Sequence, residues 1–481
     1  MTSAITTTSM TPSASPSPPV SRFAGQRVHM IGIGGCGMSG LADVLIHGGA
    51  VVTGTDRLGS DTTDRLAGSG ATIEIAAHPG PLPDDVDLVV ASAAVADDHP
   101  QRQAALSAGC RVIKYAQLLG ELMSERVGMA VAGTHGKSTT TAWTTFALRL
   151  AGLDPTYVVG AQVPQLGAAA AVGDGPHFVA EACEYDRSFH HLNFHYAVVL
   201  NVEEDHLDYY RDAEDIEAAF TDFARRLTAP GMLLVNGDDA PSRRVAERAD
   251  VPFETFGFNE FATWRAVGLE SRRGCFAFDL QHNGHTLCRA TLQLAGRHHV
   301  FNALATAALA HHAGVEPEPL GLALSTFEGA SRRLTCKGTP GGITILDDYA
   351  HHPTEIRATL QAARDRYRPR KLWAVFQPHQ HSRTRLFLDE FARSFSAADE
   401  VIVPDIYFVR DCESERERVE ARDLVECIRR QGGSAQYGSD FSSIVQLVDE
   451  QTEPGDVVIT LGAGDIWQVA DELANRLGHD H

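Results

Sequence analysis

The segment that decides the fold of this chain is Val127-Gly-Met-Ala-Val-Ala-Gly133-Thr-His-Gly136-Lys137-Ser138-Thr139. An apolar strand leads into a glycine-rich loop, and the loop leads into a helix, as in the phosphate-binding loops of α/β proteins. The motif is not a complete G-x-x-x-x-G-K-S/T, because position 131 is Val and the first glycine is Gly133. The Lys137 ammonium can still contact β and γ phosphates, and the Ser138 hydroxyl can bind Mg²⁺. We therefore predict a nucleotide site at residues 133–139, with Lys137 in a surface loop.

A second glycine-rich loop lies nearer the start of the chain. Gly32-Ile-Gly34-Gly-Cys-Gly37 follows the strand-like residues 27–33, and Asp56 ends the next predicted strand, 19 residues after Gly37. This order of strand, G-x-G-x-x-G, helix and acidic residue is the dinucleotide fingerprint in its usual context. The glycines allow close backbone approach, and the helix N-terminus attracts a diphosphate. NAD, FAD and UDP-sugars all carry a diphosphate, and a structural tight turn is the alternative interpretation.

Strands and helices alternate along the chain in three blocks. The blocks open with apolar strands at residues 27–33, 127–133 and 341–347. A length of 481 residues also suits three domains, at roughly 150 residues for each. We predict an α/β protein with a Rossmann-like N-terminal domain (23–125), a central P-loop-type domain with a parallel sheet (126–336) and a Rossmann-like C-terminal domain (337–481). The Ser/Thr/Pro-rich residues 1–22 are predicted to form a disordered tail.

The composition argues against several classes of protein. No apolar run reaches the ~18 residues of a membrane span, and the net charge of −21 argues against a nucleic-acid binder. The eight cysteines are irregularly spaced and form no C-x-x-C pair. The first 20 residues have neither the basic start nor the apolar centre of a signal peptide. We therefore expect a cytoplasmic protein with free thiols.

Polar residues follow the strands of the second and third blocks. Glu181 ends one strand, and His206 follows the next. Because the carboxyl ends of parallel strands meet at the edge that holds the phosphate loop, a carboxylate there would meet the Mg²⁺ of a nucleotide. Histidine is a less usual Mg²⁺ ligand, so His206 alone fits a hydrogen-bonding role. Residues 347–353 and 376–385 are predicted to be polar loops that face a ligand, and their histidines lack the spacing of a closed zinc site.

Together these segments resemble the Mur ligase family, and within it the ligases that add L-alanine. The matching segments occur in the family's order from about residue 25 to about residue 470, and their combination is highly specific although each alone is not. They are Gly32–Gly40, Gly133–Thr141, Glu181–Asp186, Asn201–Asp208, Gly296–Asn302, Asp347–Glu355, Phe376–His379 and Leu461–Asp465.

The resemblance implies an ATP-dependent ligase of peptidoglycan precursor synthesis. Its substrates would be UDP-N-acetylmuramate, L-alanine and ATP. The lactyl carboxylate of the sugar would attack the γ-phosphate to give an acyl phosphate, and the alanine amine would then displace phosphate. Two Mg²⁺ ions, replaceable by Mn²⁺, would assist. The enzyme would be a monomer or a homodimer, with no nucleic-acid or membrane partner.

The resemblance also implies a role for each matching residue. The UDP-sugar would contact Gly34, Gly35, Cys36, Gly37, Met38, Ser39, Asp56, Ser92 and Ala93. ATP would contact Gly133, Thr134, His135, Gly136, Lys137, Ser138, Thr139, Asn302, Arg333 and Asp348. The metal ions would bind Ser138, Glu181 and His206, and L-alanine would contact Tyr349, His351 and Arg383. The catalytic set would be Lys137, Glu181, His206, His351 and Arg383.

Three positions depart from common patterns of the family. Ser138 stands where Thr is frequent, His299 where Asn is common, and Gln380 where some relatives have Arg. The serine keeps the hydroxyl, and Asn302 remains as the expected amide contact to adenine. With Gln380 neutral, Arg383 remains as the strongest cation for the carboxylate of the amino acid.

One piece of family chemistry is excluded by the lysine content. Several Mur ligases carry a carbamoylated lysine after the metal-binding histidine, and its carboxylate serves the second Mg²⁺. No lysine lies between Lys137 and Lys337. No carbamate can therefore form after His206 in the central domain, and we expect Glu181 and His206, with water and phosphate oxygens, to complete the second site.

Other functions remain open at this stage. A related recycling ligase joins UDP-N-acetylmuramate to a tripeptide, and the segment Glu181–Asp186 does not separate the two decisively. An NAD-dependent dehydrogenase would explain the first glycine-rich loop and Asp56 but not the Gly-Lys-Ser loop. A non-catalytic UDP-sugar binder would not need Lys137, Glu181 and His206 together.

Overall fold

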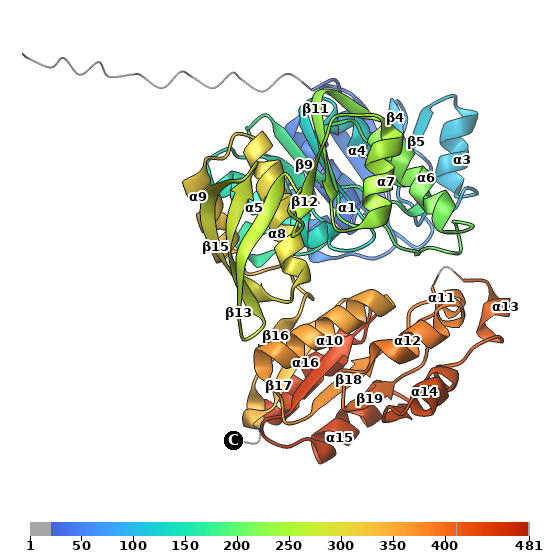
Figure 1. Ribbon diagram of the computed structural model, residues 1–481. Coiled ribbons are helices and arrows are strands. Elements are labelled where there is room, and N and C mark those ends of the chain that lie inside the picture. Colours follow the sequence, from blue (N-terminus) through green and yellow to red (C-terminus); the bar gives the residue numbers. More distant parts are fainter. Residues whose placement is uncertain (1–20, 410, 480–481) are drawn as a thin grey trace, which may run out of the picture.

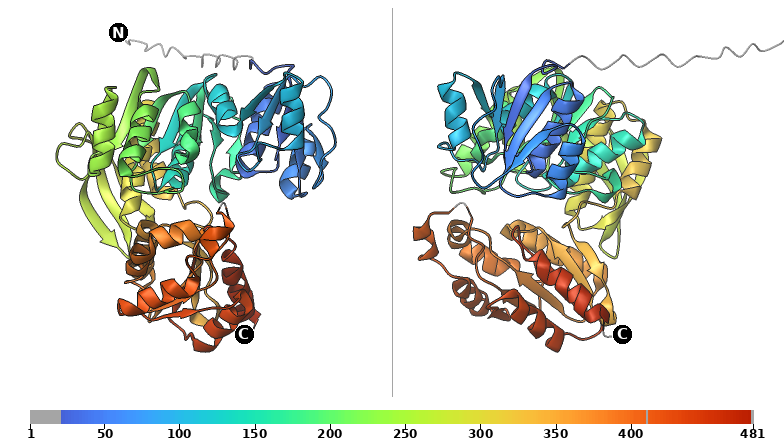
Figure 2. Two further views of the ribbon diagram at one scale, coloured as in Figure 1. Left: turned by 90° about the vertical axis from the view of Figure 1, so that its right-hand side faces the viewer. Right: turned by 180° about the vertical axis from the view of Figure 1, so that it is seen from behind.

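The computed structural model describes residues 21–409 and 411–479, so most of the predicted tail lies outside the described residues. These residues form three α/β domains, each built around its own sheet. In Figure 1 the N-terminal and central domains (blue to yellow) lie next to each other, and the C-terminal domain (orange to red) lies below them. The two further views in Figure 2 show the same arrangement. The predicted three-domain α/β fold is confirmed.

The N-terminal domain has a parallel sheet of five strands in the order β3-β2-β1-β4-β5. The order reverses between β1 and β4, so the carboxyl ends of these strands form the crevice where such sheets bind ligands. The Rossmann-like topology predicted for this domain is confirmed. Its elements are β1 (Arg27–Ile31), α1 (Cys36–His47), β2 (Val51–Asp56), α2 (Asp61–Gly68), β3 (Thr72–Ile75), β4 (Leu88–Ala91), α3 (Pro100–Ser107), β5 (Arg111–Lys114) and α4 (Tyr115–Met123).

The central domain has a sheet of ten strands in the order β15-β14-β13-β12-β11-β10-β6-β9-β7-β8. Its middle is parallel as predicted, but β13, β14 and β15 form an antiparallel extension that was not predicted. The strands are β6 (Val127–Ala132), β7 (Thr156–Val158), β8 (Ala170–Ala171), β9 (His177–Glu181), β10 (Phe194–Val199), β11 (Leu227–Asn236), β12 (Phe253–Gly257), β13 (Trp264–Arg272), β14 (Cys275–His282) and β15 (His285–Ala295). The helices are α5 (Lys137–Leu150), η1 (Pro164–Leu166), η2 (Tyr185–His191), α6 (Ala213–Ala224), α7 (Ala240–Ala249), α8 (His298–His312) and α9 (Pro317–Thr326).

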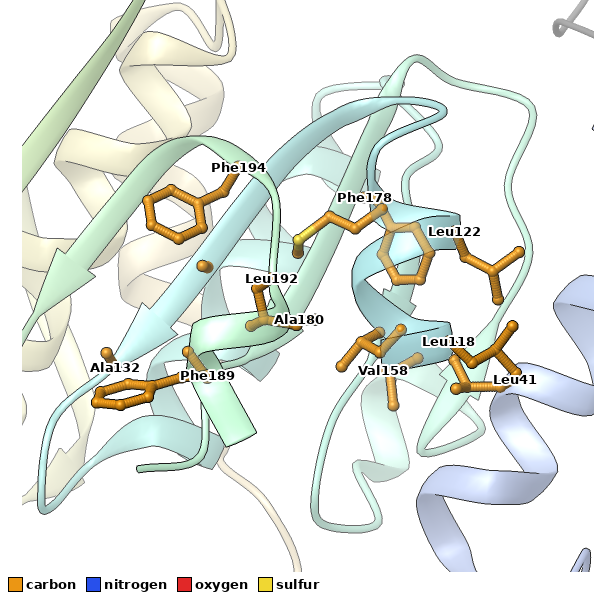
Figure 3. Close-up of a cluster of buried hydrophobic side chains, with 14 of the residues drawn as sticks. Leu41, Leu118, Leu122, Ala132, Val158, Phe178, Ala180, Phe189, Leu192 and Phe194 are labelled. Atoms are coloured by element: carbon orange, nitrogen blue, oxygen red, sulfur yellow. The ribbon is translucent and has the colours of Figure 1, made fainter. Parts of the chain in front are cut away.

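The N-terminal and central domains share one cluster of buried apolar side chains. Figure 3 shows Leu41 of α1 and Leu118 of α4 beside Val158 of β7. The approach is close enough that a Cβ on Gly120 would lie 1.9 Å from the carbonyl oxygen of His191. Only glycine fits there, so Gly120 allows α4 to pack closely against the central domain.

The C-terminal domain has a sheet of six strands in the order β16-β17-β21-β18-β19-β20. All neighbours are parallel except β16 with β17. The strands are β16 (Thr335–Gly338), β17 (Thr344–Asp348), β18 (Leu372–Phe376), β19 (Glu400–Val403), β20 (Ala435–Tyr437) and β21 (Val457–Leu461). The helices are η3 (Pro340–Gly342), α10 (Pro353–Tyr367), α11 (His381–Leu386), α12 (Leu388–Ser394), α13 (Glu413–Arg416), α14 (Ala421–Arg430), α15 (Phe441–Gln451) and α16 (Trp467–His479).

The described residues show where two of the domains have their outermost contacts. The third sheet begins at Thr335, two residues before the predicted boundary at 337. At the other end, Ser21 Oγ and the Arg22 backbone N–H donate to Glu125 at 3.3 and 3.0 Å, so these two residues attach to the N-terminal domain. Across the described residues, no helix is long and apolar enough to cross a membrane.

Candidate active site

The phosphate loop connects β6 to α5. Gly133 and Gly136 have φ values of 136° and 85°, which are strained for other residues. A Cβ on Gly133 would lie 2.9 Å from Cβ of Leu200, and one on Gly136 would lie 2.8 Å from Oδ1 of Asn302. The loop therefore needs both glycines to fit against the next strand and α8. α5 begins directly after it, so its N-terminal N–H groups are available to an anion.

Lys137 is the first residue of α5, and the prediction that it lies in a surface loop is wrong. Its side chain is largely buried, because the loop folds around it. Nζ donates hydrogen bonds to the carbonyl oxygens of Gly133 and Thr134 at 2.6 and 3.0 Å, and to Oε1 of Glu184 at 2.9 Å. Burial disfavours the ammonium, but Glu184, together with Cys183 and Glu181, outweighs burial and raises the pKa of Lys137. Lys137 is therefore charged at neutral pH, and its three hydrogen bonds fix its position.

Glu181 and His206 face one cavity of about 400 Å³ beside Lys137. Glu181, at the end of β9, accepts hydrogen bonds from the Gly160 N–H and the Ser138 hydroxyl, and burial raises its pKa. His206 has a φ of 53°, an unusual value for a residue with a side chain. Its Nε2 lies 3.6 Å from Oε1 of Glu184. The structure thus brings together all three predicted metal ligands.

Glu184 also lines this cavity, although nothing in the sequence pattern singled it out. It is only 3% exposed. Burial opposes its ionisation, but Lys137 and His206 lower its pKa below the usual value. Its Oε2 lies 2.9 Å from Lys137 Nζ and accepts no other hydrogen bond within the described residues. Buried carboxylate oxygens, a hydroxyl and an imidazole form a donor set that suits Mg²⁺ or Mn²⁺.

The C-terminal domain closes the other side of the same cavity with Tyr349 and His351. His351 Nδ1 lies 3.1 Å from the carbonyl oxygen of Tyr349 and 3.4 Å from Glu355. Burial lowers the pKa of His351 to about 4, so its imidazole is neutral at pH 7. The guanidinium of Arg333 lies 5.4 Å from the centre of the Tyr349 ring.

A second cavity, of about 180 Å³, adjoins the phosphate loop on the side of α8. Five predicted ATP contacts line it: His135, Gly136, Thr139, Asn302 and Arg333. A sixth, Asp348, is buried there, and burial raises its pKa to about 6. His299 also lines the cavity, and its Nδ1 lies 3.4 Å from Nδ2 of Asn302. Arg333 lines both cavities, so the two are neighbours.

A polar network joins the phosphate loop to the start of α10. His135 Nδ1 lies 3.1 Å from Glu355, and its Nε2 lies 3.5 Å from Glu203. Thr354 donates to Glu203 at 2.7 Å. Burial disfavours the imidazolium of His135, but Glu203 and Glu355 outweigh it and raise its pKa to about 9. His135, Glu203 and His352 also have ligand atoms within 4.8 Å of one another. The protonated ring favours an ion-pair network over a metal site here.

Arg383 is buried and pairs with Asp205. Its side chain is 6% exposed, and its guanidinium lies 2.5 Å from Oδ1 of Asp205. Asp205 lines the cavity beside Lys137 that Glu181 and His206 also face, whereas Arg383 is absent from the described residues that line it. The guanidinium overcomes burial and lowers the pKa of Asp205. Arg383 thus reaches the cavity through Asp205.

The first glycine-rich loop lies at the crevice of the N-terminal sheet. The Gly34 N–H donates to Oδ2 of Asp56 at 2.8 Å. A Cβ on Gly37 would lie 2.8 Å from the Tyr115 ring, and one on Gly32 would lie 3.1 Å from Cβ of Ser92. The loop, Asp56 and Ser92 therefore converge. Among the other predicted sugar contacts, Gly35 is the N-cap of α1, Cys36 its first residue, and Ala93 follows Ser92, while the side chains of Met38 and Ser39 are buried.

Sequence models of three domains match consecutive parts of the chain. They are described as the Mur ligase family catalytic domain over residues 27–127, the Mur ligase middle domain over residues 131–310, and the Mur ligase glutamate ligase domain over residues 332–464. The chain belongs to the Mur ligase family.

Relatives and solved structures agree with this family. The chain is 40% identical over 450 residues to a protein of Caldanaerobacter subterraneus named UDP-N-acetylmuramate–L-alanine ligase, covering 93% of this chain and 97% of the relative. The crystal structure of the UDP-N-acetylmuramate–alanine ligase of Thermotoga maritima matches with a TM-score of 0.77 and 26% identity, over 94% of this chain and 98% of that one. A murein peptide ligase from Psychrobacter arcticus matches with a TM-score of 0.68 and 26% identity, over 95% and 100% of the two chains.

Proposed function

We propose that this protein is an ATP-dependent ligase that joins L-alanine to the lactyl carboxylate of UDP-N-acetylmuramate in peptidoglycan precursor synthesis. One observation carries the proposal. The central domain brings Lys137, Glu181 and His206, and the C-terminal domain brings Tyr349 and His351, to a single cavity. The 40% identical relative of Caldanaerobacter subterraneus carries the same activity in its name. We assign the enzyme to the cytoplasm, as a monomer or a homodimer.

The two neighbouring cavities suit the two halves of the reaction. We assign adenosine to the cavity beside Asn302 and the γ-phosphate to the boundary near Lys137. The UDP group would lie at the glycine-rich loop 32–37, with Asp56 and Ser92 beside it. The lactyl carboxylate would then enter the cavity lined by Glu181 and His206. This arrangement directs the carboxylate at the phosphoryl group, as an in-line displacement needs.

Two anions must approach each other in the first step. The buried Lys137 ammonium offsets that repulsion and stabilises charge on the transferring phosphoryl group. Mg²⁺, bound by Ser138, Glu181 and His206, would supply further positive charge to the phosphates and the carboxylate. Burial keeps Glu181 and His206 among fixed dipoles, so little reorganisation is needed during the transfer.

The second step joins the amine to the acyl phosphate. We assign the alanine to the side of the cavity formed by Tyr349 and His351. The imidazole of His351, neutral because its pKa is near 4, can accept a hydrogen bond from the incoming amine. We assign the amino-acid carboxylate to Arg383, whose guanidinium would have to leave Asp205 to bind it.

The recycling ligase is the second candidate, because the murein peptide ligase of Psychrobacter arcticus has a similar structure. The dehydrogenase interpretation is set aside, because it leaves the whole cavity around Lys137 unexplained. The test is phosphate release from ATP with UDP-N-acetylmuramate and either L-alanine or the tripeptide L-Ala-γ-D-Glu-meso-diaminopimelate. We expect release with L-alanine and little with the tripeptide. Preference for the tripeptide would support the recycling ligase, and release with neither would overturn both.

A further inference from the structure

Glu184 is a buried carboxylate held between two groups of the proposed catalytic set. It lies just before η2, and its backbone oxygen accepts the Tyr210 hydroxyl at 2.5 Å, which fixes its position. Both carboxylate oxygens lie 2.9 Å from Lys137 Nζ, and Oε1 also lies 3.6 Å from His206 Nε2. Apart from this ion pair with Nζ, Oε2 accepts no hydrogen bond within the described part of the chain. A buried carboxylate oxygen that depends on a single ammonium is a candidate metal ligand when that ammonium moves away.

The hydrogen bonds of Lys137 show what nucleotide binding must change. An ammonium has three N–H donors, and Lys137 directs them to Gly133, Thr134 and Glu184. A phosphate oxygen can accept from Nζ only if one of these partners gives way. The two carbonyl partners belong to the loop itself, so Glu184 is the partner that can be exchanged without unfolding the loop. Removing the ammonium from Glu184 would take the closest counter-ion away from a buried carboxylate, which is costly.

The absence of other lysines in the central domain indicates which cation takes the place of Lys137 beside Glu184. Because no lysine lies between Lys137 and Lys337, no carbamate carboxylate can serve the second metal ion of the central domain. Glu184, Glu181 and His206 line the same cavity. A divalent cation beside His206 would compensate the charge of Glu184 once Lys137 turns to the phosphates. A carboxylate suits Mg²⁺ and Mn²⁺ better than imidazole alone.

We propose that Glu184 exchanges partners during nucleotide binding: it leaves Lys137 and becomes a ligand of the second divalent ion, next to Glu181 and His206. The inference rests on the proposed metal-dependent ligase. It makes nucleotide binding and binding of the second ion mutually dependent, since each favours the state in which Lys137 and Glu184 are apart.

The test is a Mn²⁺ titration monitored by electron paramagnetic resonance in the presence of a non-hydrolysable ATP analogue. The wild type is compared with the Glu184→Gln variant. We expect two Mn²⁺ ions per wild-type chain and one per variant chain. In EDTA, where no divalent ion is free, the variant should bind the analogue about tenfold more tightly than the wild type, because Lys137 no longer has to leave a charged partner. A merely structural role would not move these two readouts in opposite directions.

The control is Glu217→Gln. Glu217 is also a buried carboxylate, paired with Arg244 and Arg248, but it lines neither cavity. The Glu217→Gln variant should bind two Mn²⁺ ions per chain and have the nucleotide affinity of the wild type. If Glu184→Gln does not fold, as judged by circular dichroism, Lys137→Met replaces it: this variant should bind one Mn²⁺ at Glu184 without nucleotide.

Two bound ions in Glu184→Gln, or unchanged or weaker nucleotide binding in EDTA, would overturn the proposal. So would a Lys137→Met variant that binds no Mn²⁺ without nucleotide. Alanine-dependent phosphate release is measured on the same wild-type sample. A wild type that binds two ions but releases no phosphate with L-alanine would refute the proposed function and leave the role of Glu184 standing.

Discussion

Replacing Lys137 by alanine should damage both turnover and stability. The change removes the ammonium that lies 2.9 Å from Glu184 and that also donates to two carbonyl oxygens of the phosphate loop. The side chains of Lys137 and Glu184 are 17% and 4% exposed, so the pair is largely out of water. The variant keeps a buried carboxylate whose nearest cation has gone.

The two effects have different sizes and causes. Losing one preorganised contact to the transferring phosphoryl group costs about 10²-fold or more in turnover. Removing one partner of a buried ion pair costs about 3–5 kcal/mol of stability, because the other charge stays buried. A surface lysine would cost within about 0.5 kcal/mol. The expected loss of stability thus depends on the burial of this pair.

Turnover is measured as phosphate release. Stability is measured by urea unfolding monitored through tryptophan fluorescence, to which the buried Trp143 and Trp264 of the central domain contribute. The double variant Lys137→Ala/Glu184→Gln is the matched control. Removing the stranded charge should restore most of the stability but none of the turnover. Near-normal stability of Lys137→Ala, or recovery of turnover in the double variant, would refute the reasoning.

Four further results are expected. Arg383→Ala should raise the KM for L-alanine more than that for ATP or the UDP-sugar; equal rises in all three KM values would contradict the assignment. Turnover should not respond to removal of CO₂ and bicarbonate, because no lysine between Lys137 and Lys337 can form a carbamate; rescue by bicarbonate would disprove this. The pKa of His135 is raised from 6.5 to about 9, so its stabilising effect is complete below pH 6.5 and lost as the pH rises through 9; the difference in unfolding free energy between wild type and His135→Gln should shrink over that range. Glycine and L-serine should be poorer substrates by about 10- to 200-fold in kcat/KM, since a methyl group discriminates by only about 1–3 kcal/mol; complete rejection would point to a stricter pocket.

The features that were predictable from sequence are local ones. A strand, a glycine-rich loop and a helix lie within a few residues of one another, so the loops at 32–37 and 133–139 could be recognised directly. The ends of parallel strands meet at one edge, which is why Glu181 and His206 could be placed near the phosphate loop without a structure.

The features that were missed depend on contacts between distant residues. Arg383 pairs with Asp205 across 178 residues, and this contact exists only once the domains have packed together. Glu184 lies three residues after Glu181, but its direction is set by the irregular turn that follows, where Asp186 and Arg187 have φ values of 53° and 51°. No periodic sequence pattern predicts such a turn, so the sequence did not indicate that Glu184 also faces the cavity.

The most direct test of the proposed reaction follows oxygen from the substrate to the product. The substrate is UDP-N-acetylmuramate with ¹⁸O in both oxygens of its lactyl carboxylate. It is incubated with ATP, L-alanine and the enzyme, and the masses of the released phosphate and of the UDP-sugar–alanine product are measured by mass spectrometry. An acyl phosphate predicts one ¹⁸O in the released phosphate and one in the new amide of the UDP-sugar–alanine product. Phosphate without ¹⁸O, or no mass increase corresponding to one added alanine, would contradict the account.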